Sequence, residues 1–475
     1  MKKTLERELK FDVEEGFEFP ELGGRRQPER TFTSTYHDTP DRRLLGCGIT
    51  LRRRVEQRAG LWQLKLPSED GRFELEERGG PSRVPIAFVD LLPALLRGDS
   101  VLEPVAKLRT RRQVATVTRD ADRIEVVLDA VTVLDGTKIA WTFTELEAEV
   151  VNGRGKALGV VGKELRKAGA RRTDGTSKLA RALAHVQPAS EPGPAGDEPI
   201  DRLRSLLVAQ YRTLLANDPG VRLGADPEAV HQARVATRRA RALLRAAGAI
   251  VEPAWAEPLR TELAWLGKLL GPVRDLDVLV GHVADEAAAL EGGDIRAVGT
   301  IRGRLGRQRG TARRTLLEAM SEPRYFKLLD TFAGAGHAPA GTSTASLEQI
   351  AADAFKRARK AMKALPEDPS DDELHTVRIE TKRARYAAEL AEPVLGKAGA
   401  RFLGRAKVVQ DVIGDHQDAC VAEARIRELA VSGGVSAALA AGRLIERQQA
   451  RKRAARAALP DAWRAFAKAG RSTFA

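Results

Sequence analysis

The sequence is poor in cysteine, in aromatic residues and in long apolar runs, and each shortage excludes a class of protein. Only two cysteines, Cys47 and Cys420, are present, too few for a disulfide framework or a thiolate metal site. No apolar run reaches the length of about 18 residues that a membrane-spanning helix needs. The N-terminal residues are charged throughout and lack the apolar core of an export signal. We therefore expect a cytoplasmic protein that has no membrane partner.

Positive charge, by contrast, is in excess. The chain of 475 residues has 79 Lys and Arg against 65 Asp and Glu, a net charge of +14. Such a balance favours an anionic partner, whether nucleic acid, a membrane surface or a small polyanion. The length suggests about three domain-sized units, each able to bury its own core.

Residues 1–187 are predicted to form one domain that consists mostly of strands. About eight β-rich runs occur, near 5–11, 30–37, 49–55, 61–66, 72–78, 104–118, 122–134 and 140–151. Apolar residues at helical spacing interrupt them at 84–96 and 157–169. Residues 188–199 are rich in proline and have no apolar periodicity, which is typical of a linker.

Charged residues recur at every second position along these strands. Glu6, Glu8 and Lys10 point to one side of an extended strand, since successive side chains alternate between its faces. The other rows are Arg52 and Arg54; Arg72, Glu74 and Glu76; Lys107, Arg109 and Arg111; and Glu145, Glu147 and Glu149. Rows of mixed sign on five strands are hard to explain as a solvent-facing surface alone.

Residues 200–475 are predicted to form an all-α domain built from a duplicated unit. Helices are expected near 200–217, 226–249, 253–269, 273–291, 295–320, 346–364, 371–392, 399–413, 416–431 and 436–457. The segment HQARVATRRAR at His231 is repeated as HTVRIETKRAR at His375, and two further matches follow in the same order. We therefore expect two repeats, about 200–335 and 345–475, of four helices each.

A basic stripe runs along each repeated helix. At about 100° per residue, Arg234, Arg238 and Arg241 lie on one side of the first helix and apolar residues on the other. No carboxylate between residues 231 and 247 balances these arginines. Guanidinium groups bind phosphate oxygens in pairs, so the stripes favour an extended anion site over a solvated face. The candidate residues are His231, Arg234, Arg238, Arg239 and Arg241, then His375, Arg378, Lys382, Arg383 and Arg385.

The scarcity of aromatic residues bears on which anion these stripes bind. Aromatics make up 5% of the chain and none lies within the stripes, so stacking platforms for single-stranded nucleic acid are few. No zinc finger or recognition helix is recognisable. Inorganic polyphosphate needs charge without base recognition, so it is a better candidate than nucleic acid.

The motifs of the first half resemble those of the CYTH domain, the triphosphate tunnel metalloenzyme fold. Its ExExK signature stands here as Glu6, Glu8 and Lys10. The supporting matches are YHDTPDRRLLGCGITLRRR at 36–54, Lys65 in WQLKL, ELEAEVVNG at 145–153 and Ser177 with Lys178. The second half resembles a CHAD domain, a duplicated helical bundle, through its repeated HxxRxxx[RK]RxR pattern.

These resemblances imply an α+β protein of two domains, a closed antiparallel β tunnel with flanking helices followed by an all-α duplicated four-helix bundle. They imply metal-dependent hydrolysis of a triphosphate, with Mg²⁺ or Mn²⁺ as cofactor, joined to polyphosphate binding and association with polyphosphate granules. The catalytic residues would be Glu6, Glu8 and Lys10. The substrate-binding residues would be Arg52, Arg54, Lys65, Arg72, Lys107, Arg109, Arg111 and Lys178. The metal ligands would be Glu6, Glu8, Glu74, Glu76, Glu145, Glu147 and Glu149.

Two alternatives remain open at this point. One is a protein whose tunnel captures phosphates without turnover, and the other is adenylate cyclase activity, which also occurs among CYTH domains. The sequence assigns no residue to an adenine pocket. The second repeat departs from the first at Lys382 and at His416, which leaves open whether the two copies bind equally.

Overall fold

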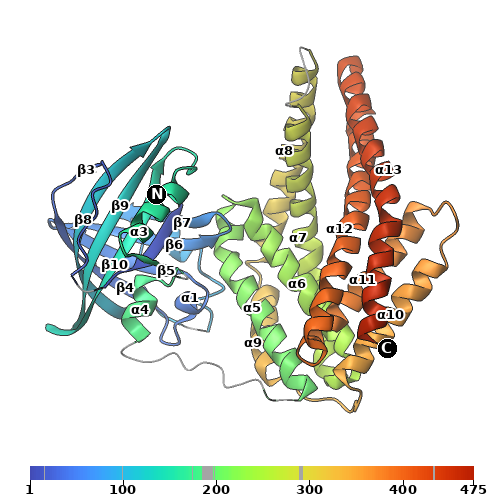
Figure 1. Cartoon of the computed structure of the whole chain (residues 1–475), viewed down its shortest axis with the longest axis horizontal. Helices are drawn as coiled ribbons and strands as arrows, with labels where there is room; N and C mark the ends of the chain where they lie inside the picture. Colours follow the sequence, from blue (N-terminus) through green and yellow to red (C-terminus); the bar gives the residue numbers. More distant parts are fainter. Residues whose placement is uncertain are drawn as a thin grey trace. The chain divides into compact units, whose positions relative to one another are not determined.

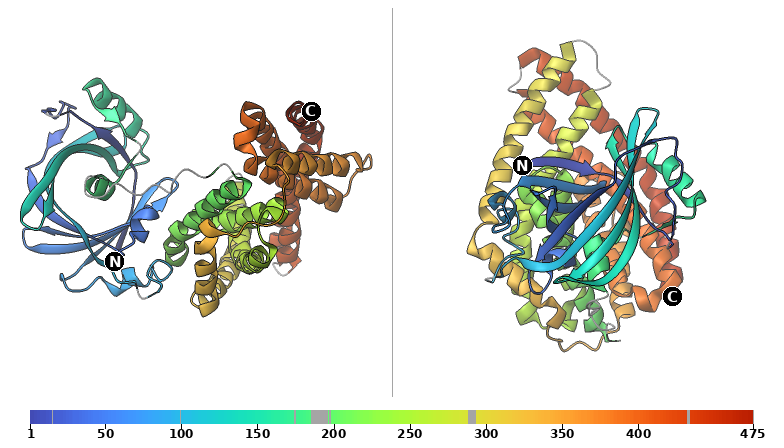
Figure 2. Two further views of the ribbon diagram at one scale, coloured as in Figure 1. Left: turned by 90° about the horizontal axis from the view of Figure 1, so that it is seen from below. Right: turned by 90° about the vertical axis from the view of Figure 1, so that its left-hand side faces the viewer.

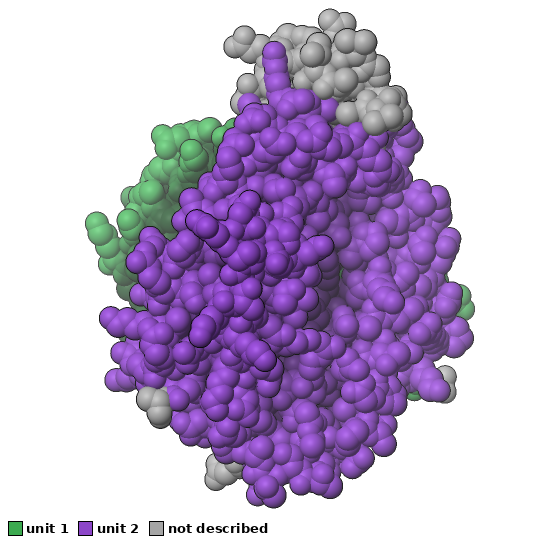
Figure 3. Space-filling view, turned by 90° about the vertical axis from the view of Figure 1, so that its right-hand side faces the viewer, with its two compact units in different colours: residues 1–193, 212–229 green, residues 194–211, 230–475 purple. Residues whose placement is uncertain are grey.

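The structure is a computed structural model of the chain, and the residues it describes fall into two compact units. Described are residues 1–14, 16–98, 100–173, 175–184, 196, 198–287, 293–431 and 434–474. One unit comprises residues 1–193 and 212–229, and the other comprises 194–211 and 230–475 (Figure 3). The predicted linker, 188–199, lies almost wholly outside the described residues, so the boundaries at 187 and 200 stay predictions.

The first unit contains one antiparallel sheet. Its strands are β1 (Lys2–Glu6), β2 (Glu8–Asp12), β3 (Arg25–Arg26), β4 (Arg30–Asp38), β5 (Thr50–Glu56), β6 (Ala59–Ser68), β7 (Gly71–Arg78), β8 (Glu103–Arg119), β9 (Asp122–Asp135), β10 (Lys138–Asn152) and β11 (Arg171–Arg172). They pair in the order β1-β7-β6-β5-β4-β8-β9-β10-β2-β11, and β3 pairs with β8. The eight predicted runs are all strands, and the short β3 and β11 were not predicted.

The N-terminal segment closes this sheet into a ring. β1 pairs with β7 and β2 pairs with β10, so the two strands join opposite ends of the sheet. Only Arg7 separates β1 from β2, and its carbonyl accepts a hydrogen bond from the Val150 amide. Gly71 lets β7 approach, because an added Cβ would lie 1.9 Å from the Glu6 carbonyl oxygen. Figure 2 shows the ring end-on, and closure gives the sheet an interior, as expected of a tunnel.

Helices cover the outside of the ring and fill part of its inside. They are α1 (Arg43–Gly46), α2 (Ile86–Val89), α3 (Leu158–Lys167) and α4 (Lys178–Ala184). On the outside, Val161 of α3 packs in a core cluster with Leu146. The helix α4 lies inside the ring (Figure 2). Its Leu179 and Leu183 pack in a cluster with Tyr36. One part of the interior is therefore apolar and closed by α4, and the charged residues line the rest. The helix expected at 84–96 is only one turn, α2.

The segments that follow are helical. They are α5 (Pro199–Leu223), α6 (Pro227–Ala247), α7 (Pro253–Ala287), α8 (Gly293–Ala319), α9 (Pro323–Ala333), α10 (Leu347–Lys363), α11 (Asp371–Leu390), α12 (Glu392–Val431) and α13 (Gly434–Thr473) (Figure 1). The repeated motif lies on α6 and α11, so α5–α8 correspond to α10–α13, which confirms the duplicated bundle. The helix α9 was not predicted.

Two pairs of predicted helices each fall within one long helix: 253–269 and 273–291 in α7, and 399–413 and 416–431 in α12. The helix α7 runs through Pro272, where the sequence suggested a break between 253–269 and 273–291. Proline removes one backbone hydrogen bond, and burial of the flanking Leu270 and Val273 keeps the helix continuous. In the described part of the chain, no helix combines the length and apolar character needed to cross a lipid bilayer.

Candidate tunnel site and basic groove

Strand register decides which charged side chains share the tunnel interior. Residues directly paired in an antiparallel sheet point to the same face. Glu8 pairs with Glu149, and Lys65 pairs with Glu74. The same interior row contains Glu6, Lys10, Arg30, Arg52, Arg54, Gln63, Arg72, Glu76, Arg112, Asp129, Glu145 and Glu147. Most of the predicted tunnel residues are therefore brought together.

The row expected on β8 is the exception. Lys107, Arg109 and Arg111 are exposed and lie on the outer face of the strand, away from the interior. Arg112, one position further, pairs with Asp129 and faces inward. The prediction for these three placed them on the wrong face, because three basic residues at spacing two looked like an interior row. The interior base on β8 is Arg112.

Two lysines are held by carboxylates on one side of the interior. The Lys10 ammonium lies 2.6 Å from Glu147 and 3.4 Å from Glu145. The Lys178 ammonium lies 2.7 Å from Glu145, 2.8 Å from Glu147 and 3.2 Å from Asp129. Burial alone would lower the pKa of Lys10, but Glu147 and Glu145 raise it, so the lysine stays charged. Glu145 and Glu147, expected as metal ligands, therefore hold lysines in place.

A second group of carboxylates has too few cations nearby, and we call Glu6, Glu8, Glu74 and Glu149 the acidic cluster. Burial, together with Glu6 and Glu8, raises the pKa of Glu149 to about 8. Burial also raises the pKa of Glu6, although Lys65 lies 2.5 Å from it. Carboxylates crowded in this way are stabilised by a hard divalent cation, which prefers oxygen ligands.

The other charged residues of β7 lie around this cluster. Glu76 accepts a hydrogen bond of 2.9 Å from Gln63, which in turn accepts one of 2.8 Å from Arg52. Arg72 is the register partner of Glu6 on the neighbouring strand β1. It lines a hollow of about 460 Å³ together with Glu8, Lys10 and other residues. Of the acidic cluster, Glu8 lines this hollow.

Four guanidinium groups gather across the interior, and we call Arg30, Arg52, Arg54 and Arg112 the arginine cluster. Burial and the neighbouring Arg52, Arg112 and Arg30 lower the pKa of Arg54. The ring of Phe32 lies 4.8 Å from the Arg54 Cζ and 5.2 Å from the Arg112 Cζ. An anion bound among these cations would relieve their repulsion. The interior thus holds a group of guanidinium groups and a group of carboxylates in one row.

Several interior residues were missed by sequence reasoning: Arg30, Gln63, Arg112, Asp129 and Arg181, the last of which lies on α4 at 3.4 Å from Glu145. Asp129 carried a usable signal, since it is a single charge in the apolar run VVLDAVTVL. The structure explains it, because Asp129 receives two hydrogen bonds of 2.7 and 2.6 Å from Arg112. A buried charge of this kind is stable only when it is paired.

In the helical unit, the stripes of α6 and α11 face each other. Burial lowers the pKa of Lys382 to about 7, with Arg378 on its own helix and Arg238 and Arg234 on α6 adding to the effect. Burial and the same two α6 arginines lower the pKa of Arg378, against the influence of Asp418. The two copies of the repeat therefore contribute to one site.

Two hollows lie along these stripes and together form what we call the basic groove. The first, of about 560 Å³, is lined by His231, Arg234, Arg238, Arg378 and residues of α7 and α12. The second, of about 410 Å³, includes the basic residues Arg238, Arg241, Arg245, Arg260, Arg357, Lys382 and Arg383. Arg238 lines both. Among the described residues that line the second hollow, none is a carboxylate.

The predicted groove residues divide into paired and unpaired groups. Arg239 and Arg385 both bind Glu389, at 2.9 and 3.0 Å, and Arg383 binds Glu380. Arg234 lies 2.6 Å from Asp275, and His375 lies 3.1 Å from Gln417. In the described part of the chain, Arg238, Arg241, Arg378 and Lys382 form no ion pair. Arg245 continues the stripe of α6, whereas Arg260 and Arg357 come from other helices and left no signal in the repeat.

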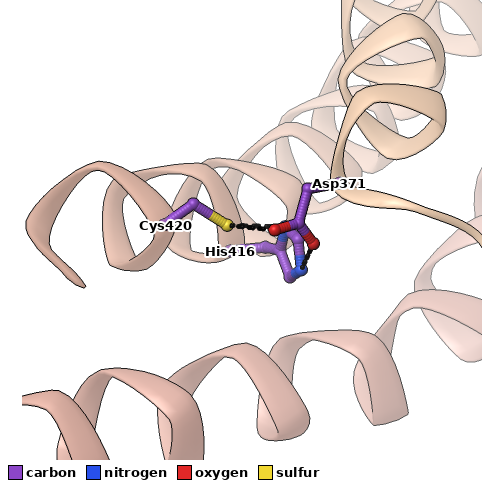
Figure 4. Close-up of side chains that lie close together, drawn as sticks. All are labelled: Asp371, His416 and Cys420. Carbon is purple, nitrogen blue, oxygen red and sulfur yellow. Dashed lines mark hydrogen bonds and ion pairs between the residues drawn. The ribbon is translucent and has the colours of Figure 1, made fainter. Parts of the chain in front are cut away.

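A separate cluster joins α11, α12 and α13. Asp371, His416 and Cys420 place an oxygen, a nitrogen and a sulfur within 4.8 Å of one another (Figure 4). Arg456 already binds both Asp371 and His416, at 2.9 and 3.2 Å, and Lys452 lies 3.0 Å from Asp371. These two cations would repel a metal ion, so we assign the cluster to packing between helices. It accounts for His416, one of the positions at which the second repeat departs from the first.

Comparison with known proteins agrees with this division. Residues 4–182 match the CYTH domain and residues 205–427 match the CHAD domain. The chain is 32% identical over 481 positions to an uncharacterised protein of Mycobacterium tuberculosis, covering 91% of this chain and 90% of that protein. Among solved structures, it is similar to PptA from Streptomyces chartreusis, at 26% identity and a TM-score of 0.48, covering 56% of this chain and 99% of that one. It is also similar to the CHAD domain from the plant Ricinus communis, at 26% identity and a TM-score of 0.46, covering 56% and 92%.

The chain therefore belongs to the family of proteins that join a CYTH domain to a CHAD domain. CYTH domains are metal-dependent tunnel enzymes, and they include triphosphatases and adenylate cyclases. CHAD domains are linked to polyphosphate binding.

Proposed function

We propose that the tunnel hydrolyses an inorganic or organic triphosphate with the aid of Mg²⁺ or Mn²⁺. The observation that carries this proposal is the acidic cluster beside the arginine cluster in one closed interior. Hydrolysis of a phosphoric anhydride needs cations on the phosphate oxygens and a metal site next to them. The tunnel offers residues of both kinds within one row.

The donor set of the acidic cluster fits a hard divalent cation. Mg²⁺ is commonly held by one or two carboxylates together with waters and substrate phosphates, which does not require a tight cage of protein ligands. Glu6, Glu8 and Glu149 would hold it. Burial and the charges of Glu6 and Glu8 raise the pKa of Glu149, and a bound cation would neutralise those charges. Such an ion would supply charge neutralisation at the phosphate oxygens.

The remaining interior residues bind and orient the substrate. Arg52, Arg54 and Arg112 would contact the phosphate oxygens, since guanidinium groups bind them in bidentate fashion. Lys65 fixes the Glu6 carboxylate at 2.5 Å. Lys10 and Lys178 add positive charge beside Glu145 and Glu147, and their ion pairs with these carboxylates hold them in place. The helix α4 closes part of the interior, which limits water there and strengthens each electrostatic contact.

This activity is tested by comparing phosphate release from tripolyphosphate, ATP and thiamine triphosphate, each with Mg²⁺, with Mn²⁺ and with EDTA. We expect metal-dependent release that is faster from tripolyphosphate than from ATP, since no residue is assigned to a base. Formation of cyclic AMP from ATP would favour a cyclase instead. Binding of tripolyphosphate with no release under any metal would leave the tunnel a capture site and contradict the proposal.

The helical domain is proposed to bind inorganic polyphosphate in the basic groove. The support is the convergence of Arg238 and Arg241 from one repeat with Arg378 and Lys382 from the other. A polyanion without bases needs only such a row of cations, along which it binds in any register. Hydrolysis is not expected in this domain.

Substrate affinity of the tunnel is expected to depend on the inner arginines and not on the outer ones. Arg54→Ala removes one of the guanidinium groups of the arginine cluster, and KM for tripolyphosphate should rise by roughly 10-fold for one charge-assisted contact of about 1.5 kcal/mol. Arg109→Ala is the matched control, since Arg109 is exposed on the outer face. Steady-state kinetics of both variants decide the point, and an equal rise in KM would contradict the interior assignment.

Metal affinity of the tunnel is expected to increase as the pH rises through about 8, the pKa of Glu149. Below that pH the folded protein keeps the proton on Glu149, so a cation must displace it, and above that pH no proton competes. Calorimetric titration with Mn²⁺ on both sides of this pH measures the effect. Glu149→Gln should bind Mn²⁺ more weakly and lose the pH dependence, whereas Glu103→Gln, which changes an exposed carboxylate of β8, should keep both. A wild-type slope in Glu149→Gln would contradict the assignment.

A further inference from the structure

Lys382 stands apart from the other cations of the basic groove. Its side chain is half-buried and lines the second hollow, next to Arg238 from α6. The charged groups that act on it are Arg234 and Arg238 from α6, Arg378 from α11, and Asp418 from α12. Three cations thus face one ammonium group, and the single carboxylate among these neighbours forms no ion pair with it. The other side chains of the hollow do not balance this excess.

This environment favours the uncharged amine. Burial and the three arginines lower the pKa of Lys382 to about 7, so near neutral pH about half of the population carries a free electron pair. Arginine stays protonated in the same surroundings, which makes Lys382 the group of the hollow that can react as a nucleophile. The hollow has room for a small molecule, at about 410 Å³.

We propose that Lys382 is a modification site that acyl phosphates acylate, with the arginines of the second hollow binding the phosphate of the reagent. The Lys382 nitrogen attacks the acyl carbon, a carbon–nitrogen bond forms, and the carbon–oxygen bond to phosphate breaks. The products are an amide on Lys382, inorganic phosphate and the proton released by the amine. No oxidant or further reactant is needed.

The arginines determine which acyl donors react. Arg238 and Arg241 line the same hollow as Lys382 and would hold the anionic end of the reagent beside the amine. They would also stabilise the departing phosphate, whose charge increases as the bond breaks. An uncharged acyl donor gains neither benefit. The site therefore selects phosphorylated donors. The reactivity of the amine alone would not produce this selectivity.

Acylation would abolish the charge that Lys382 acquires when an anion binds. Amide formation leaves no basic nitrogen, so the groove loses one cation and gains bulk where α6 and α11 meet. This consequence for polyphosphate rests on the proposed function of the groove. The acylation itself does not, and it is measured without polyphosphate.

The test uses the full-length protein, acetyl phosphate as probe and mass spectrometry of the lysine residues near neutral pH. Lys382 is expected to be acetylated at least about 10-fold faster than an ordinary lysine, because far more of its amine is uncharged and that gain exceeds its lower basicity. Lys360, exposed on α10, is the reference within the same chain. With N-acetylimidazole, which is uncharged, the preference for Lys382 should be several-fold smaller.

Arg238→Ala should slow acetylation of Lys382 by acetyl phosphate more than acetylation by N-acetylimidazole. Loss of Arg238 raises the pKa of Lys382 and so affects both reagents, whereas the phosphate contact is lost for acetyl phosphate alone. Circular dichroism is the check on folding. If that variant does not fold, the comparison of the two reagents on the wild-type protein decides alone. Equal rates at Lys382 and Lys360, or the same preference with both reagents, would overturn the inference. Polyphosphate binding measured in parallel separates the outcomes: intact binding without selective acetylation defeats only this inference, and the reverse result defeats only the proposed function.

Discussion

Glu6→Gln and Glu8→Gln are each expected to lower metal-dependent phosphate release from tripolyphosphate by roughly 100-fold, which corresponds to about 3 kcal/mol of transition-state stabilisation. Each change removes a negative charge from the acidic cluster, where burial raises the pKa of Glu6 even with Lys65 nearby. A neutral amide of the same shape is a poorer ligand for Mg²⁺, so the metal should bind more weakly. The measurement is kcat with Mg²⁺ varied up to saturation.

The control for these variants is Glu103→Gln, because Glu103 is an exposed carboxylate on β8. It should keep the wild-type rate. Partial rescue of Glu6→Gln by higher Mg²⁺ would support a ligand role, since weaker binding is overcome by mass action. Wild-type kcat in both glutamine variants would remove the acidic cluster from the mechanism.

The second large effect is expected in the basic groove. The triple variant Arg238→Ala, Arg241→Ala, Arg378→Ala should bind long-chain polyphosphate at least about 100-fold more weakly, since each charge-assisted contact contributes roughly 1.5–3 kcal/mol. These are groove arginines without an ion pair in the described part of the chain, so their removal leaves no buried acid unpaired. Titration of fluorescently labelled polyphosphate at physiological salt measures the change.

Three exposed cations of α12 provide a matched control for the triple variant. Arg401, Arg405 and Lys407 line neither hollow, and their joint replacement by alanine removes the same net charge. The affinity of the wild-type protein for polyphosphate should increase as the salt concentration is lowered, because binding releases counterions. DNA bound as tightly as polyphosphate at equal phosphate concentration would contradict the assignment, as would equal losses in the two triple variants.

Some of the candidate site could be read from spacing alone. Glu6, Glu8 and Lys10 lie on one face because the strand period is two, and this holds wherever the strand is placed. The same rule failed on β8, where Lys107, Arg109 and Arg111 obey the spacing but face outward. Alternation groups residues into two faces, and only pairing with neighbouring strands decides which face is inside.

The helical half shows a similar limit. The repeat at His231 and His375 predicted two related basic helices, and these are α6 and α11. It did not reveal Arg260 or Arg357, which enter the second hollow from α7 and α10. A helix period describes one helix at a time, so residues supplied by neighbouring helices leave no pattern in the sequence.

The sequence by itself determined the two fold classes, the charged rows and the duplication, because each depends on periods within a short stretch of chain. The tertiary structure decided which charges are available. Closure of the sheet placed Lys10 and Lys178 against Glu145 and Glu147, and left Glu149 with a pKa of about 8. Electrostatic interactions depend on distance and burial, and these are set by residues far apart in the chain. Glutamates two residues apart on one strand therefore acquire different roles.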